Sequence, residues 1–127
     1  RRRCLIPIQT FYEWTGTVGN KQAFAFKAAD SDSRLWAAGI WEPGDEQPAY
    51  SMLTTSASET VSTIHDRMPA LLQPEDFETF LTAENPRYLL NPVNDGLEIY
   101  RCRNPLSETG IQNNPQREDQ LPGFEDI

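Results

Sequence analysis

The sequence predicts an α+β domain that contains more strand than helix. Alternating or continuously apolar segments recur along the chain, and turn residues separate them at short intervals. This spacing favours an antiparallel meander over βαβ units, because parallel strands need long crossover connections. Helix-start signals occur at two places, both after residue 55. The length of 127 residues fits one domain.

The first strands are predicted from hydrophobic patterning. Residues 5–15 predict one long strand that bends at Pro7. Residues 23–29 alternate, which places Phe24 and Phe26 on one face.

A more continuous apolar run at residues 35–42 predicts a central strand buried on both faces. Trp36 and Trp41 lie in this run, which favours the core for them over stacking on nucleobases. The remaining expected strands are residues 49–55, 89–93 and 97–102, with a turn at residues 94–96.

Two helices are predicted in the second half of the chain. Ser56 and Glu59 have the spacing of a capping box, and the helix that follows must stop before Pro69. The second helix begins at Pro74, which suits a first turn. The expected core-facing residues are Val61, Ile64 and Met68 in the first helix, and Phe77, Phe80 and Leu81 in the second.

The charge and hydropathy of the chain exclude several classes of protein. A net charge of −8 argues against bulk, nonspecific affinity for nucleic acid, although a local basic groove is compatible with it. No apolar run reaches the roughly 18–20 residues that a membrane span needs. The basic residues 1–3 lead into a short, proline-broken apolar stretch rather than a signal peptide. We therefore expect a cytoplasmic protein without a membrane anchor.

The two cysteines, Cys4 and Cys102, lack the spacing of a metal site or a disulfide framework. Both fit small buried hydrophobic residues on strands, and the alternative for Cys4 is a thiolate favoured by the arginines beside it. No glycine-rich phosphate loop or metalloprotease motif occurs. We expect neither a metal nor a cofactor.

The only histidine, His65, lies in the segment Ile64-His65-Asp66-Arg67-Met68-Pro69. Asp66 could orient the imidazole, and Arg67 is suited to bind a phosphate or carboxylate with two parallel hydrogen bonds. A lone histidine is often structural, so these neighbours carry the catalytic hypothesis.

A second cluster, Phe11-Tyr12-Glu13-Trp14, sets one carboxylate among aromatic rings. Strand alternation places Tyr12 and Trp14 on one face and Glu13 on the other. Glu13 is then either a solvent-facing glutamate or a carboxylate whose pKa is raised by burial, which could act as base or acid. Trp14 could stack on bases, and Thr54 could donate its hydroxyl to a phosphate, although threonines at strand ends are commonly β-formers.

Taken together, five segments resemble the SOS-response-associated peptidase (SRAP) family in order and spacing, and the resemblance runs from residue 1 to about 115. A later segment, residues 111–115, looks like the closing segment of that family. Residues 116–127 are left as a polar, acidic tail. The five segments are Arg2-Arg3-Cys4-Leu5-Ile6-Pro7, Phe11-Tyr12-Glu13-Trp14, Ala37-Ala38-Gly39-Ile40-Trp41-Glu42, Thr54-Thr55-Ser56-Ala57 and Ile64-His65-Asp66-Arg67-Met68-Pro69.

The resemblance implies a curled, β-rich, mostly antiparallel sheet with two or three short helices. It also implies binding of single-stranded DNA and recognition of abasic sites. Family members expose an amino-terminal cysteine by removing their own initiator methionine. The amine and thiol of that cysteine trap the abasic aldehyde as a thiazolidine crosslink.

The resemblance further implies roles for individual residues. Glu13 matches a glutamate that assists proton transfer around the amine, and His65 matches a histidine that acts on the opened sugar. Arg67 matches an arginine that contacts a DNA phosphate. Thr54 and Trp14 fall in segments near the DNA groove.

The sequence also departs from the family pattern, because it begins at Arg1 without the amino-terminal cysteine. Cys4 does not replace that residue, since it has no free α-amine beside its thiol. We therefore expect the carboxy-terminal portion of such a domain, whose unpaired strand edges and uncovered apolar surface lead either to self-association or to a poorly ordered first strand. Whether the chain is itself an enzyme stays open. The alternatives are a noncatalytic module that binds single-stranded DNA or a partner, and an unrelated small hydrolase that uses Glu13 and His65.

Overall fold

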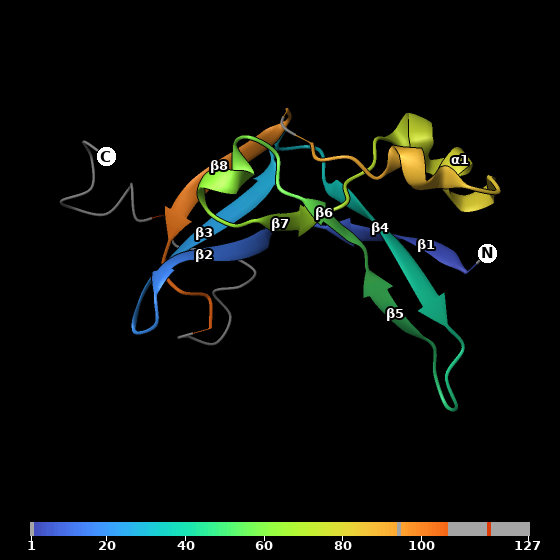
Figure 1. Ribbon diagram of the computed structural model, residues 1–127, viewed down its shortest axis with the longest axis horizontal. Helices are drawn as coiled ribbons and strands as arrows, with labels where there is room; N and C mark the ends of the chain where they lie inside the picture. The colour runs from blue at the N-terminus through green and yellow to red at the C-terminus, as the bar shows by residue number, and fades with distance from the viewer. Residues whose placement is uncertain (1, 94, 107–116, 118–127) are drawn as a thin grey trace.

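The computed structural model describes residues 2–93, 95–106 and 117, and it is built from antiparallel strands. One sheet has the order β1-β4-β5 and the other has the order β2-β3-β8, while β6 and β7 form a two-stranded ribbon. The ribbon lies between the two sheets in Figure 1. The bounds are β1 Arg3–Ile8, β2 Phe11–Thr17, β3 Asn20–Ala28, β4 Leu35–Glu42, β5 Ala49–Met52, β6 Thr54–Ser56, β7 Arg67–Pro69 and β8 Leu97–Cys102. The predicted β-rich α+β class is confirmed.

Helical structure is short. The α-helix α1 (Phe77–Thr82) directly follows the 3-10 turn η2 (Pro74–Asp76), and the other 3-10 turns are η1 (Val61–Thr63) and η3 (Pro86–Leu89). Phe80 of α1 is buried with Ala38 of β4, so the helix covers one face of the β1-β4-β5 sheet (Figure 1). Arg3 donates hydrogen bonds to the carbonyls of Leu81 and Ala83, which ties β1 to the end of this helix.

The main core cluster joins both sheets to the segment between β6 and β7. Phe26 of β3 is fully buried, and the ring of Phe11 stacks on it with ring centroids 4.6 Å apart. Val61 and Met68 pack into this cluster from η1 and β7. The remaining buried members are Ile6, Ile8, Ala37 and Leu71. This packing holds residues 61–68 against the β2-β3-β8 sheet.

The prediction of one strand over residues 5–15 is wrong, because two strands with different partners replace it. Ile8 pairs with Leu35 in the first sheet, whereas Phe11 pairs with Phe26 in the second. Residues 49–55 divide similarly, into β5 and β6. Between β5 and β6, the N–H of Leu53 donates to the carbonyl of Ala38 in β4, and the carbonyl of Leu53 accepts from the N–H of Ala70. Local alternation cannot reveal such a change of partner.

The capped helix expected between residues 56 and 68 is also wrong, since only the η1 turn forms. The backbone of Ser56 pairs with Arg67 in the β6–β7 ribbon, which a helix would prevent. Ser58, rather than Ser56, supplies the side-chain oxygen that accepts the N–H of Val61, at 3.3 Å. The apolar stripe did indicate burial, because Val61 and Met68 are 0% and 1% exposed.

Three smaller expectations need correction. Residues 89–93 form no strand, and η3 ends there instead. The strand Leu35–Glu42 is central, but its end is not buried on both faces, because Ile40 and Trp41 are 46% and 38% exposed. Trp36 is half-buried against Phe77. Leu81, expected in the core, is 38% exposed.

Residues 111–115 lie outside the described residues, as does most of the predicted tail. Arg117 is the described residue of that tail, and it forms an isolated β-bridge with Cys102. Its guanidinium lies 4.2 Å from the ring centroid of Tyr100. Arg117 thus packs against β8.

Candidate active site

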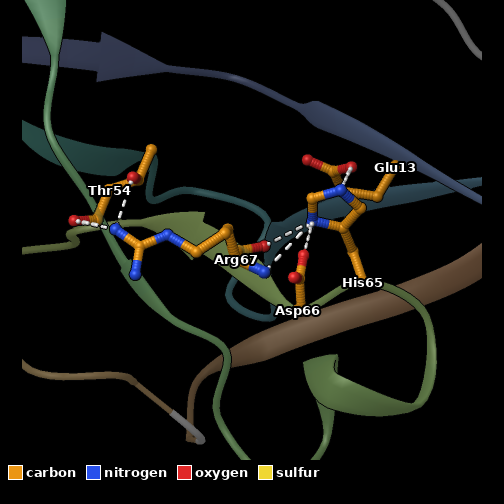
Figure 2. A network of polar contacts seen from close by, with 5 residues as sticks. All are labelled: Glu13, Thr54, His65, Asp66 and Arg67. Carbon is orange, nitrogen blue, oxygen red and sulfur yellow. Dashed lines mark hydrogen bonds and ion pairs between the residues drawn. The ribbon is translucent and has the colours of Figure 1, made fainter.

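The two segments singled out in the sequence meet in the fold. His65 Nε2 lies 3.4 Å from Glu13 Oε2, although 52 positions separate the residues (65 − 13). Figure 2 shows the imidazole facing the carboxylate, with Asp66 and Arg67 beside it. The fold thus brings Glu13 and His65 into contact.

Glu13 points toward His65 because of strand alternation in β2. Phe11 and Glu13 share the face that meets the main core cluster, whereas Tyr12 and Trp14 pack on the reverse face with Ala23. His65 follows η1, and its backbone N–H donates to the carbonyl of Val61 at 3.0 Å. Because Val61 is buried, this turn fixes the position of the His65 backbone, from which the imidazole projects.

The other ring nitrogen of His65 is held by the backbone of Arg67. The Arg67 N–H donates to Nδ1 at 3.1 Å, and the Arg67 carbonyl oxygen lies 3.0 Å from the same atom. The first contact suits a neutral ring that carries its proton on Nε2, facing Glu13. The second suits a ring protonated at Nδ1. The geometry therefore accommodates both states that proton transfer requires.

Sequence reasoning assigned the orienting role to Asp66 and missed the backbone of Arg67. Asp66 Oδ1 lies 3.6 Å from Nδ1, and the Asp66 side chain is 90% exposed. Backbone contacts leave no signature in residue types, so only the structure could reveal them.

The surroundings of Glu13 raise the pKa of its carboxyl group. Burial raises the pKa of Glu13, the nearby His65 lowers it, and Asp66 raises it again, with a net shift upward. The Glu13 side chain is 24% exposed and that of His65 is 39% exposed, so solvent and a ligand can reach both. A carboxyl with a raised pKa beside an imidazole is suited to general acid–base chemistry near neutral pH.

Arg67 and Thr54 meet across the β6–β7 ribbon. Arg67 Nη2 donates to Thr54 Oγ1 at 2.9 Å and to the Thr54 carbonyl at 3.1 Å. Both residues are exposed, and Figure 2 shows the guanidinium turned toward Thr54 and away from the Glu13–His65 pair. A fixed guanidinium of this kind is a ready site for a phosphate or carboxylate.

The structure separates Trp14 from the other candidate site residues, which are Glu13, Thr54, His65 and Arg67. Trp14 lies on the reverse face of the β2-β3-β8 sheet and lines a cavity of about 550 Å³. The other lining residues are Gly19, Lys21, Asn104 and Leu106. A ligand that contacts both Trp14 and His65 would have to pass around the edge of the sheet.

The cysteines favour the structural interpretation. Cys102 is buried, and Cys4 is half-buried beside an apolar cavity of about 490 Å³ lined also by Trp41 and Tyr50. Burial raises the pKa of Cys4, which opposes the reactive thiolate considered from the sequence. Within residues 2–93, 95–106 and 117, no three His, Cys, Asp or Glu residues gather closely enough to hold a metal. The described residues also include no helix long and apolar enough to cross a bilayer.

Comparisons with known proteins identify relatives of this chain. The chain is 32% identical to the abasic site processing protein YoqW of Bacillus subtilis, an alignment that covers 91% of this chain and 56% of YoqW. It is 36% identical to the abasic site processing protein HMCES of Gallus gallus, over 59% of this chain and 29% of HMCES. The chain thus spans about half, or less, of the length of these relatives.

Solved structures and the family model give the same result. A crystal structure of a protein from Bacteroides thetaiotaomicron matches with a TM-score of 0.74 and 26% identity, over 86% of this chain and 53% of that one. Residues 1–108 match the model of the family described as SOS response associated peptidase (SRAP). The chain therefore belongs to the SRAP family.

Proposed function

We propose that this chain takes part in the processing of abasic sites in single-stranded DNA. In this proposal Glu13 and His65 transfer protons at the abasic sugar, and Arg67 with Thr54 binds a neighbouring phosphate. The observation that carries the proposal is the 3.4 Å contact between the carboxylate of Glu13 and Nε2 of His65. Its support from outside the structure is that the relatives YoqW and HMCES are named abasic site processing proteins.

The chemistry of an abasic sugar suits an acid and a base held together. The closed sugar is a hemiacetal, and it must open to an aldehyde before a nucleophile can attack. Opening breaks the C1′–O4′ bond, adds a proton to O4′ and removes the proton of the C1′ hydroxyl. In the proposal, the imidazolium form of His65, whose Nδ1–H donates to the Arg67 carbonyl, supplies the first proton from Nε2, and the carboxylate of Glu13 accepts the second.

The finer part of the proposal concerns the crosslink. In thiazolidine formation, an amine nitrogen and a thiol sulfur both bond to the aldehyde carbon, and the aldehyde oxygen leaves as water. Both nucleophiles must come from one amino-terminal cysteine. The nitrogen of Cys4 is bound in the peptide bond to Arg3, so Cys4 cannot perform this reaction. The proposal assigns the step to an amino-terminal cysteine exposed by self-removal of methionine, which the family resemblance implies, with the same proton-transfer pair assisting.

Free L-cysteine can replace that nucleophile in a direct test. We expect the chain to accelerate thiazolidine formation between free cysteine and an abasic oligonucleotide, measured by mass spectrometry of the oligonucleotide. Glu13→Gln and His65→Ala should each slow the accelerated reaction by about 10²-fold, the usual contribution of a positioned acid or base. Glu42→Gln, which neutralises an exposed glutamate on β4, is the control that should keep the full rate.

The outcomes separate the competing functions. No acceleration by the native chain over buffer would contradict the proton-transfer proposal. Salt-sensitive binding of the oligonucleotide without acceleration would favour a noncatalytic DNA-binding module instead. Turnover of a soluble substrate without DNA would favour an unrelated hydrolase.

A further inference from the structure

A cross-strand row of the β2-β3-β8 sheet leads from Glu13 to an arginine that the sequence analysis did not single out. Phe24 of β3 pairs with Glu13 on one side and with Arg101 of β8 on the other. Residues paired directly across antiparallel strands project from the same face of the sheet. Arg101 therefore leaves the sheet on the Glu13 face. Neighbouring strands lie 4.7–4.9 Å apart, so about 10 Å separates the two backbones.

The same face of β8 meets the segment that carries His65. Ile99, two residues before Arg101, and Ile64, directly before His65, both pack against the main core cluster. Arg101 is the next residue on this face after Ile99. The exposed Arg103 follows one residue beyond the end of β8. Arg101 thus leaves the sheet on the β8 side of the Glu13–His65 pair, and Arg103 follows directly where the strand ends.

The other cations of this sheet lie on its reverse face. Lys21 and Lys27 alternate in β3 with Phe24 and Phe26, so they share the face of Trp14. Lys27 is also engaged with Glu98 at 3.4 Å. Among the described residues of β2, β3 and β8, Arg101 is therefore the cation on the Glu13 face. In a chain with a net charge of −8, this placement distinguishes the two faces.

We propose that Arg101 and Arg103 form a second phosphate-binding position for single-stranded DNA, on the β8 side of the Glu13–His65 pair. Arg67, turned toward Thr54, serves the β6 side of the same pair. The two positions would hold phosphates on either side of the sugar that faces Glu13 and His65. Guanidinium groups suit this role because they bind phosphate with two parallel hydrogen bonds. That the ligand is DNA rests on the function proposed above.

The salt dependence of DNA binding tests this inference. Removing one phosphate contact to a single strand reduces the slope of log K against log salt by about 0.7. We expect that reduction, with several-fold weaker binding, for Arg103→Ala and for Arg101→Ala. Arg34→Ala removes the same charge from the loop between β3 and β4 and should change neither quantity, because that loop borders a cavity that neither Glu13 nor His65 lines. The probe is an abasic oligonucleotide, and the readout is fluorescence anisotropy.

Folding and strand direction are controlled separately. The Nε of Arg101 is buried, so thermal unfolding of Arg101→Ala must be checked, and Arg101→Lys retains the charge if the alanine variant unfolds. The exposed Arg103 gives the cleaner variant. Two oligonucleotides that extend from the abasic site on only the 5′ or only the 3′ side complete the test. The β8 arginines should matter for one of them, and Arg67→Ala should matter for the other.

Failure of this inference differs from failure of the proposed function. If the native chain does not bind the oligonucleotide, the proposed function fails. If it binds, and Arg67→Ala weakens binding while the Arg101 and Arg103 variants keep the native slope, the second phosphate position is overturned. If Arg34→Ala weakens binding equally, the effect comes from net charge alone, and the second phosphate position is also overturned.

Discussion

The two three-stranded sheets are both antiparallel but differ in what their open surfaces carry. In β2-β3-β8, the face beyond the core cluster carries Glu13 and Arg101, and the segment with His65 packs against it. In β1-β4-β5, the corresponding outer end carries Trp41, Tyr50 and Met52, which are 38%, 67% and 38% exposed. One sheet surface is thus equipped for a polar ligand and the other for apolar contact. The polar surface combines Glu13 and Arg101 on the strands with the His65 segment that packs against them, so the strands and the packed segment both contribute to it.

The largest expected effect is a difference in the free energy of unfolding between a substitution in the covered core and one on the exposed surface. Phe26→Ala should lower the free energy of unfolding by about 3–5 kcal/mol, because Phe26 is fully buried and stacks on Phe11. Tyr50→Ala, on the exposed surface of the other sheet, should stay within about 0.5 kcal/mol. Urea unfolding measures both. Similar losses in the two variants would mean that the β1-β4-β5 surface is covered in solution.

A second, smaller effect concerns the hairpin that carries Glu13. A Cβ at Gly16 would lie 2.5 Å from the carbonyl oxygen of Asn20, whereas a Cβ at Gly19 would meet no atom within 4 Å. Both glycines have positive φ, so an alanine at either position would carry backbone strain of a similar kind. Gly16→Ala should therefore cost about 1–3 kcal/mol more than Gly19→Ala in the same unfolding assay. Equal costs would show that the hairpin relaxes freely around Gly16.

The third effect is a dependence of stability on pH that originates at Glu13. Burial raises the pKa of this carboxyl in the folded chain above its ordinary value of 4.5, so the folded state binds the proton more tightly than the unfolded state. The stability that this group contributes is complete below pH 4.5 and is lost as pH rises through the raised value. Relative to the native chain, Glu13→Gln should therefore become more stable as pH increases across that window.

Urea unfolding from pH 4 to pH 8 measures this trend. Glu42→Gln, at an exposed position of the other sheet, is the matched control and should follow the native chain. A constant difference between Glu13→Gln and the native chain at every pH would contradict the raised pKa.

The weakest expected effect is self-association through the apolar surface of β1-β4-β5. We expect the average sedimentation coefficient, measured by sedimentation velocity, to rise with protein concentration. The double substitution Tyr50→Ser, Met52→Ser should reduce that rise. Val18→Ser alters an apolar side chain that is 93% exposed in the β2–β3 turn, and it should have no effect. If the native chain stays monomeric at high concentration, the apolar surface of β1-β4-β5 does not drive self-association.

The sequence predicted local pattern better than it predicted partners. Alternation around Phe24 and the apolar run from Leu35 to Glu42 located β3 and β4, because each of these segments forms one unbroken strand. The chain from Leu5 to Thr15 could not be divided in the same way. Its break at Gln9 and Thr10 arises only when the two halves join different sheets. Pairing is a tertiary property, and the local pattern does not encode it.

The candidate site shows the same limit. Residue chemistry identified Glu13 and His65, and the fold brings them together. The helix predicted for His65 did not form, because pairing of Ser56 with Arg67 competes with the capping signal. Alternation correctly placed Trp14 opposite Glu13, whereas the resemblance had placed Trp14, with Thr54, in segments near the DNA groove. The roles of these residues stay predictions until the experiments above are done.

Arg67 joins two parts of the site within a single residue. Its peptide groups contact Nδ1 of His65, and its guanidinium contacts Thr54. Because several rotatable bonds separate the two, an anion can draw the guanidinium away from Thr54 while the peptide groups keep their hold on the imidazole. Anion binding by the side chain and orientation of the imidazole by the backbone are then separable, so Arg67→Ala should remove the first and keep the second.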